Sequence, residues 1–72
     1  MNMKNSNIGE NAGVVWRTLN EKKFSWDELV KVTGLHPLEL ACAIGWLAKE
    51  NKIKYSLQTG IMFFDVYHEV YY

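Results

Sequence analysis

The spacing of the apolar residues changes once along this chain, at Ile53, and that change restricts the folds available to it. Before Ile53 apolar residues recur every three to four positions, as on one face of an α-helix. From Ile53 to residue 57 they alternate with polar residues, as in a half-buried β-strand. A chain that is helical first and extended last belongs to the α+β class, and 72 residues make one domain.

The first predicted helix covers residues 8–19. Gly9 and Gly13 lie four residues apart within it, and each costs a helix about 1 kcal/mol relative to alanine. Two glycines on one side therefore predict that another element approaches the helix backbone closely. Residues 1–7 lack periodicity and are predicted to be a disordered tail, and residues 20–24 a charged connection. The apolar face of this helix comprises Ile8, Ala12, Val15, Trp16 and Leu19.

Local start and stop signals delimit two further helices, over residues 26–33 and 37–50. Ser25 and Glu28 have the spacing of a reciprocal capping box, and Gly34 is suited to end the helix in the left-handed conformation. Pro37 is a favoured first residue of a helix, because its missing N–H would be unpaired there. The three-residue break with its glycine is typical of a helix-turn-helix.

The C-terminal part predicts an antiparallel β-hairpin with strands over residues 53–57 and 61–66. Gln58, Thr59 and Gly60 are predicted to form a three-residue connection, with glycine at the left-handed bulge position. Three helices followed by a short hairpin are the element order of a winged helix-turn-helix. We therefore predict one such domain over residues 8–72.

The chain resembles a bacterial family of small winged helix-turn-helix domains of unknown function, over about residues 8–63. The resemblance implies the winged-helix fold and no particular activity, and residues 67–72 lie outside it. It rests on Ile8-Gly9-Glu10-Asn11-Ala12-Gly13, Val15-Trp16, Leu19, Glu28-Leu29, Thr33-Gly34-Leu35 and Ala43-Ile44-Gly45-Trp46-Leu47-Ala48-Lys49-Glu50-Asn51-Lys52-Ile53.

The face that would read DNA in such a domain is apolar and acidic here. Outward residues of the second motif helix normally reach base edges, using Arg, Lys, Asn, Gln, Ser or Thr. None of these occurs between Pro37 and Ala48, and Glu39 would repel phosphates. Eight basic residues are balanced by eight acidic ones, without the basic excess typical of nonspecific DNA binding. The outward face comprises Leu38, Glu39, Ala41, Cys42, Gly45, Trp46 and Lys49.

A dimeric DNA-binding transcriptional regulator is the alternative prediction. Such a protein would have to contact backbone phosphates through lysines near the hairpin base and in the first loop. We favour ordinary solvated surface as the interpretation of the same residues. The lysines concerned are Lys22, Lys23, Lys52 and Lys54.

Two apolar features predict contact with another protein, either a second copy or a different chain. The first is a stripe on the third helix, although Trp46 could instead pack on the hairpin as core and the N-terminal tail could cover the rest. The second is residues 67–72, which would overhang the hairpin and either pair with a second subunit or pack along the first helix. The predicted interface residues are Leu38, Cys42, Trp46, Tyr67, Val70, Tyr71 and Tyr72.

No catalytic, cofactor or metal site is predicted. Cys42 is the single cysteine and has no His or Asp at nucleophile–base spacing. His36 is a helix N-terminal residue, and Asp65 and His68 point to opposite faces of a strand. No signal peptide, membrane span or small-molecule site is evident, and a lone thiol fits the reducing cytoplasm. The chain is therefore predicted to be a non-enzymatic, self-associating interaction module with a degenerate DNA-reading face.

Overall fold

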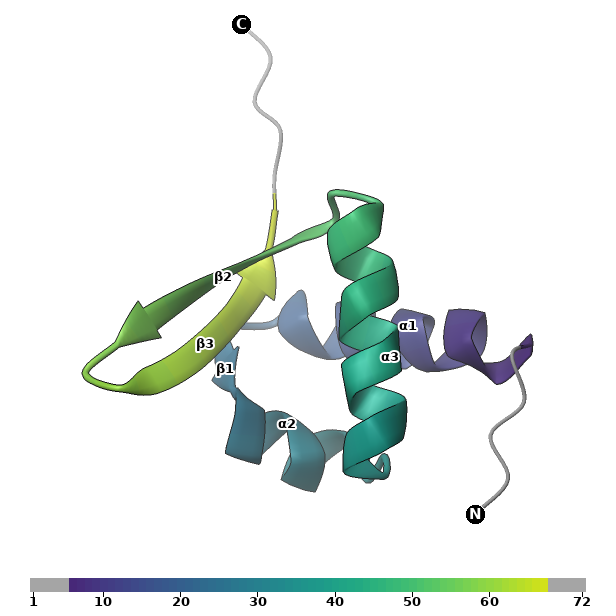
Figure 1. Ribbon diagram of the computed structural model, residues 1–72, viewed down its shortest axis with the longest axis horizontal. Coiled ribbons are helices and arrows are strands. Elements are labelled where there is room, and N and C mark those ends of the chain that lie inside the picture. The colour runs from purple at the N-terminus through teal and green to yellow at the C-terminus, as the bar shows by residue number, and fades with distance from the viewer. Residues whose placement is uncertain (1–5, 68–72) are drawn as a thin grey trace, which may run out of the picture.

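The computed structural model describes residues 6–67 and arranges three helices against one side of a small antiparallel sheet (Figure 1). Helices α1 and α3 cross and make the main helix–helix contact, while the β2–β3 hairpin projects as the wing. The predicted winged helix-turn-helix of the α+β class is confirmed. The elements are α1 (Ser6–Leu19), β1 (Phe24–Ser25), α2 (Trp26–Thr33), α3 (Pro37–Lys49), β2 (Ile53–Gln58) and β3 (Ile61–Val66).

The ends of the helices follow local signals. The Glu28 N–H donates to Ser25 Oγ at 3.2 Å, and the Ser25 N–H donates to Glu28 Oε1 at 2.9 Å, which closes the predicted capping box. The bond from the Ser25 N–H lowers the pKa of the Glu28 carboxyl, because it stabilises the charged form. This stabilisation is lost as the pH falls through the lowered pKa. Gly34 ends α2 with φ 69°, as predicted, whereas α1 begins at Ser6, earlier than predicted.

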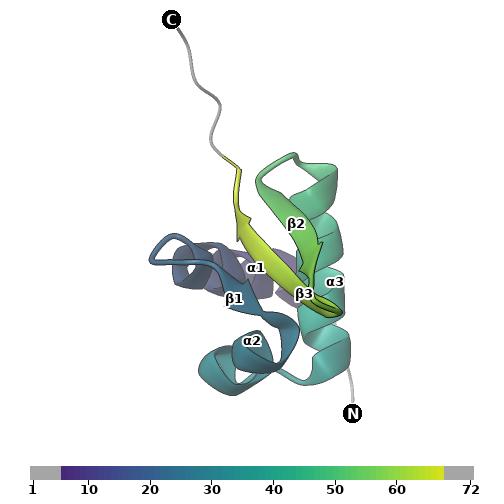
Figure 2. The ribbon, with the colours of Figure 1, turned by 90° about the vertical axis from the view of Figure 1, so that its left-hand side faces the viewer.

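The sheet contains a strand that the sequence did not indicate. Residues 20–24 were predicted as a connection, but Phe24 and Ser25 form β1 and pair with Phe64 and Phe63 of β3. The strand order is β1-β3-β2, so β3 is central (Figure 2). Two residues are too short to show an alternating pattern. Their extended conformation depends on pairing with a strand that is distant in the sequence.

The hairpin turn is tighter than predicted. Strand β2 continues to Gln58, which pairs with Ile61, so the connection has two residues and not three. Thr59 has φ 50° and Gly60 has φ 78°, and two positive φ angles are the pattern of a type I′ turn. The tighter turn sets an uninterrupted register between residues 53–58 and 61–66.

The core lies between α1, α3 and the inner side of the sheet. Trp16, which was predicted to lie on the inner stripe of α1, is at its margin and 36% exposed. Ile44 of α3 is partly buried against the core. The buried residues are Ala12, Val15, Leu19, Phe24, Leu29, Leu40, Ala43, Leu47, Ile53, Phe64 and Val66.

The predicted close approach of another element to the glycines of α1 is wrong. A Cβ atom on Gly9 would meet nothing within 4 Å, and one on Gly13 would meet only the Arg17 side chain, at 3.4 Å. The two glycines therefore do not mark a tight helix crossing. They line a shallow groove between α1 and α3, which is described below.

Candidate functional site

Helix α3 presents an apolar outer face to solvent. Its start is held by a second capping box, in which the Leu38 N–H donates to His36 Nδ1 and the His36 N–H donates to Glu39 Oε1, each at 3.1 Å. Glu39 is therefore occupied in the cap of its own helix. Leu38 remains 55% exposed, and Ala41 and Gly45 are exposed along the same helix. Leu38, Ala41 and Gly45 of the predicted outward face are therefore accessible to solvent.

The inner side of the wing is also apolar and exposed. Alternate residues of a strand share a face, so Tyr55 and Leu57 lie on the same side of the sheet as buried Ile53. They extend beyond the helices, however, and are 65% and 67% exposed. Met62, which pairs with Leu57 across the hairpin, is 37% exposed. We call Tyr55, Leu57 and Met62 the wing face.

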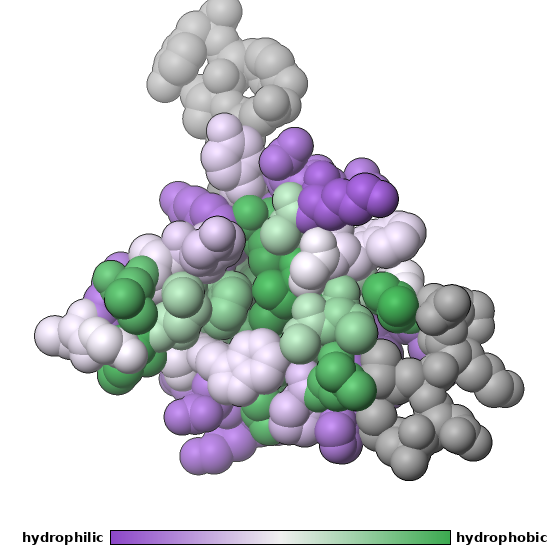
Figure 3. All heavy atoms as spheres, in the orientation of Figure 1, coloured by the Kyte–Doolittle hydropathy of each residue, from purple (hydrophilic) through white to green (hydrophobic). Residues whose placement is uncertain are grey.

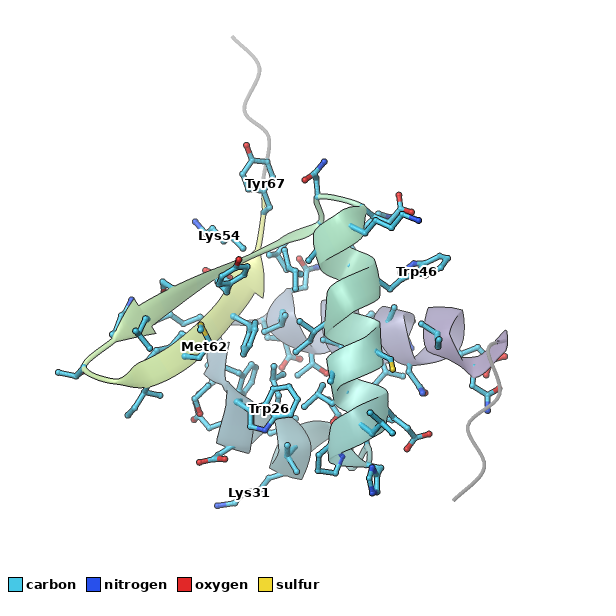
Figure 4. All side chains as sticks on the ribbon, viewed as in Figure 1. Trp26, Lys31, Trp46, Lys54, Met62 and Tyr67 are labelled. Carbon is cyan, nitrogen blue, oxygen red and sulfur yellow. The ribbon has the colours of Figure 1, made fainter. Side chains whose placement is uncertain are left out.

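Trp26 connects the wing face to the helices. Its ring lies 6.3 Å from the Phe64 ring, centroid to centroid, with an interplanar angle of 55°. In the view of Figure 4, Trp26 and Met62 both lie between the hairpin and α3. On this side hydrophobic residues spread over the hairpin and α3, between hydrophilic residues above and below (Figure 3). We define the docking face as the wing face and Trp26 together with the exposed outer residues of α3, which are Leu38, Ala41 and Gly45.

The exposure of the wing face was not predicted from the sequence. The alternation of Tyr55 and Leu57 with polar residues indicates correctly that they share the core side of the sheet. It does not show where the core ends. The signal that could have indicated it was the length of the predicted hairpin, because Tyr55 and Leu57 lie farther along the strand than the buried Ile53.

Trp46 lies away from the docking face. The alternative in which it packs on the hairpin is wrong, because it is 47% exposed and projects from the opposite side of α3 to Trp26 and Met62 (Figure 4). Cys42 is partly buried, so the predicted stripe does not form one exposed surface with Leu38. Trp46 instead lines a shallow groove together with Gly9, Ala12, Gly13, Trp16, Leu47 and Lys52.

Tyr67 lies near Trp16, in a second depression that includes Lys52, and is 49% exposed. The Tyr67 N–H donates to the Lys52 carbonyl oxygen at 2.9 Å. The hairpin ladder therefore extends to Tyr67, and the prediction that this residue has no local backbone partner is wrong. The other predicted interface residues Val70, Tyr71 and Tyr72 lie outside the described residues, as does the segment 1–5.

The four lysines considered for phosphate contact are dispersed over the surface. Lys23 lies on the outer side of the sheet, with Nζ 5.2 Å from the Phe63 ring and 3.4 Å from Gln58 Oε1. Lys54 is on that outer side too, paired across the strands with Asp65.

The other two lysines lie elsewhere. Lys22 Nζ is 5.0 Å from the Phe24 ring, and Lys52 borders the two depressions beside Trp16. This distribution provides no continuous basic track next to the outer face of α3. Within residues 6–67, no cluster of three or more His, Cys, Asp or Glu side chains is arranged to hold a metal ion, and no helix has the length and hydropathy to cross a membrane.

Comparison with known proteins identifies close relatives of this fold. Residues 3–65 match the family described as winged helix-turn-helix domain (DUF2582). The chain is also similar to the solution NMR structure of protein BT2368 from Bacteroides thetaiotaomicron, with 37% sequence identity and a TM-score of 0.79. That match covers 89% of this chain and 79% of the other. No curated protein matches the sequence.

Proposed function

Because the chain belongs to the DUF2582 family of winged helix-turn-helix domains, we propose that it is a non-enzymatic module that binds a second copy of itself through the docking face. The proposal rests on the exposure of Tyr55 and Leu57, at 65% and 67%, on the inner side of the wing. A wing that binds DNA presents cations or hydrogen-bond donors to phosphates. The single thiol of Cys42 and the bacterial structural neighbour favour the bacterial cytoplasm as its location.

The energetic argument is that apolar side chains at these positions remain in water unless a partner covers them. Complete burial of a large apolar side chain stabilises a complex by about 1.5–3 kcal/mol before the costs of association. Contiguous exposed apolar residues in a monomer mark interaction sites more often than isolated ones do. The exposed residues of the wing face provide such a group, and the partly buried Trp26 lies on the same side of the molecule as Met62. Leu38 adds an exposed apolar side chain at the start of α3.

Gly45 supports the same surface. It lies in the middle of α3, where glycine costs about 1 kcal/mol relative to alanine. A Cβ atom there would meet nothing within 4 Å, so packing within the described residues does not require glycine. A missing side chain allows a partner to approach the outer backbone of α3 closely.

Charging the wing face is expected to abolish self-association at tens of micromolar. Leu57→Lys places an ammonium group in the proposed interface, and we expect the dissociation constant to rise by at least about 30-fold, as for an interface hot spot. Sedimentation equilibrium measures this directly. Ile61→Lys is the matched control, because Ile61 is 50% exposed in the same hairpin but on the opposite side of the sheet. Equal weakening by both variants, or an 8.4 kDa monomer for the unmodified chain, would contradict the proposal.

DNA binding is expected to be weak and independent of sequence, with a dissociation constant of roughly 10⁻⁴ to 10⁻⁶ M at physiological salt. The reason is that no base-reading side chain occurs between Pro37 and Ala48 of α3, together with the dispersed lysines. Fluorescence anisotropy over a salt series separates the two modes of binding. Phosphate contacts weaken steeply with added salt, whereas apolar self-association is level or tightens. Nanomolar selection of one duplex from a random pool would disprove this prediction.

A further inference from the structure

The two edges of the sheet differ in how well they are protected. At one edge β1 has only two residues and leads directly into α2. At the other edge β2 has six residues, pairs with β3 without a bulge, and contains no proline and a single charged residue, Lys54. Natural proteins usually protect an exposed edge with charges, prolines, bulges or short strands, because a free edge pairs with other chains. Strand β2 has little of this protection.

The register shows which backbone groups point to the free edge of β2. The Tyr67 N–H donates to the Lys52 carbonyl oxygen, so these two residues form a hydrogen-bonded pair. Hydrogen-bonded and non-hydrogen-bonded pairs alternate along an antiparallel ladder. The backbone groups of Lys54, Ser56 and Gln58 therefore bond to β3. Those that point away from β3 belong to Ile53, Tyr55 and Leu57.

We propose that two copies of this chain join by antiparallel pairing of β2 with β2 about a two-fold axis, which makes one six-stranded sheet. This inference rests on the self-association proposed above and names the contact that produces it. The register centred on Tyr55 places that residue opposite Tyr55 of the second copy, and Leu57 opposite Ile53. The outward N–H of Tyr55 then meets the outward C=O of Tyr55 in the second copy, and the reverse, so the exposed centre of the strand acquires backbone partners.

The side chains are compatible with this register. Lys54 lies opposite Ser56 of the second copy. The two Lys54 ammonium groups, the only charges of the paired strands, therefore do not face each other. On the inner side of the sheet, Tyr55 and Leu57 come to lie beside the corresponding apolar residues of the second copy, which joins the two wing faces. The formal net charge of the chain is zero, so no overall repulsion opposes the contact.

Amide hydrogen exchange on the purified, intact chain tests the pairing without any substitution. We expect exchange of the Tyr55 and Leu57 amides to slow by at least about tenfold between dilute and concentrated samples, because these N–H groups become bonded only in the dimer. The Lys54 and Ser56 amides are the internal control. They already donate toward β3, so any change in their protection should be smaller.

Two substitutions at Tyr55 distinguish the contribution of its backbone N–H to dimerisation from that of its side chain. Tyr55→Pro removes the outward N–H without removing a bond of the β2–β3 ladder, a change that edge strands tolerate. Tyr55→Thr removes the ring and keeps the N–H. We expect Tyr55→Pro to sediment as a folded monomer and Tyr55→Thr to form a weaker dimer, because it loses the ring but keeps the backbone pairing.

The outcomes distinguish this inference from the function on which it rests. A dimeric mass with concentration-dependent protection of Tyr55 and Leu57 supports the pairing. A dimeric mass without that protection, or a Tyr55→Pro variant that still dimerises, overturns the pairing and leaves self-association standing. A monomer at all concentrations overturns both.

Discussion

Replacing Leu40 with alanine is expected to destabilise the domain by about 3–5 kcal/mol, the largest loss we predict for any residue of α3. Leu40 is fully buried where α3 packs against the core, so the substitution removes its contacts and leaves a cavity. For a domain of this size the loss corresponds to a fall in melting temperature of about 12–40 °C. Urea and thermal unfolding followed by circular dichroism measure it.

Leu38→Ala is the matched control for this experiment. It makes the same change two residues earlier in the same helix, where the side chain is 55% exposed. In samples dilute enough to be monomeric, we expect its free energy of unfolding to stay within about 0.5 kcal/mol of the unmodified chain. A comparable loss in both variants would show that Leu38 belongs to the core and would remove it from the docking face.

Phe64→Ala is expected to cost about 3–5 kcal/mol, because Phe64 holds several elements together. It is 8% exposed in the central strand, pairs with Phe24 of β1 and Tyr55 of β2, and contacts the Trp26 ring. Its removal leaves a cavity between the sheet and α2 and withdraws the support of Trp26 on the docking face. Denaturant unfolding gives the free energy, and tryptophan fluorescence reports the change around Trp26.

Phe63→Ala provides the control within the same strand. Phe63 lies on the outer side of the sheet, half-buried beneath the Lys23 ammonium group, and is not part of the core. We expect a loss of less than about 1.5 kcal/mol, because less area returns to water and no enclosed cavity forms. If Phe63→Ala were the more damaging of the two, the assignment of the inner and outer sides of the sheet would be incorrect.

Elements delimited by interactions between near neighbours were predictable from the sequence. The capping box of Ser25 and Glu28 involves residues three apart, and Gly34 and Pro37 act through their own backbone conformations. Helical and alternating periodicities likewise depend only on the local spacing of apolar residues. The helices, the hairpin and the absence of base-reading side chains between Pro37 and Ala48 therefore follow from the sequence.

The tertiary structure decided the features that depend on distant segments. Phe24 becomes a strand because Phe64 lies beside it, and Tyr67 gains a partner because the tight turn sets its register with Lys52. Trp46 projects toward the groove beside α1 because the packing of α3 turns it away from the hairpin. Periodicity identifies the side of a helix or strand on which a residue lies, but not whether another element covers that side. That is why the exposed wing face and the free edge of β2 emerge only when the chain is folded.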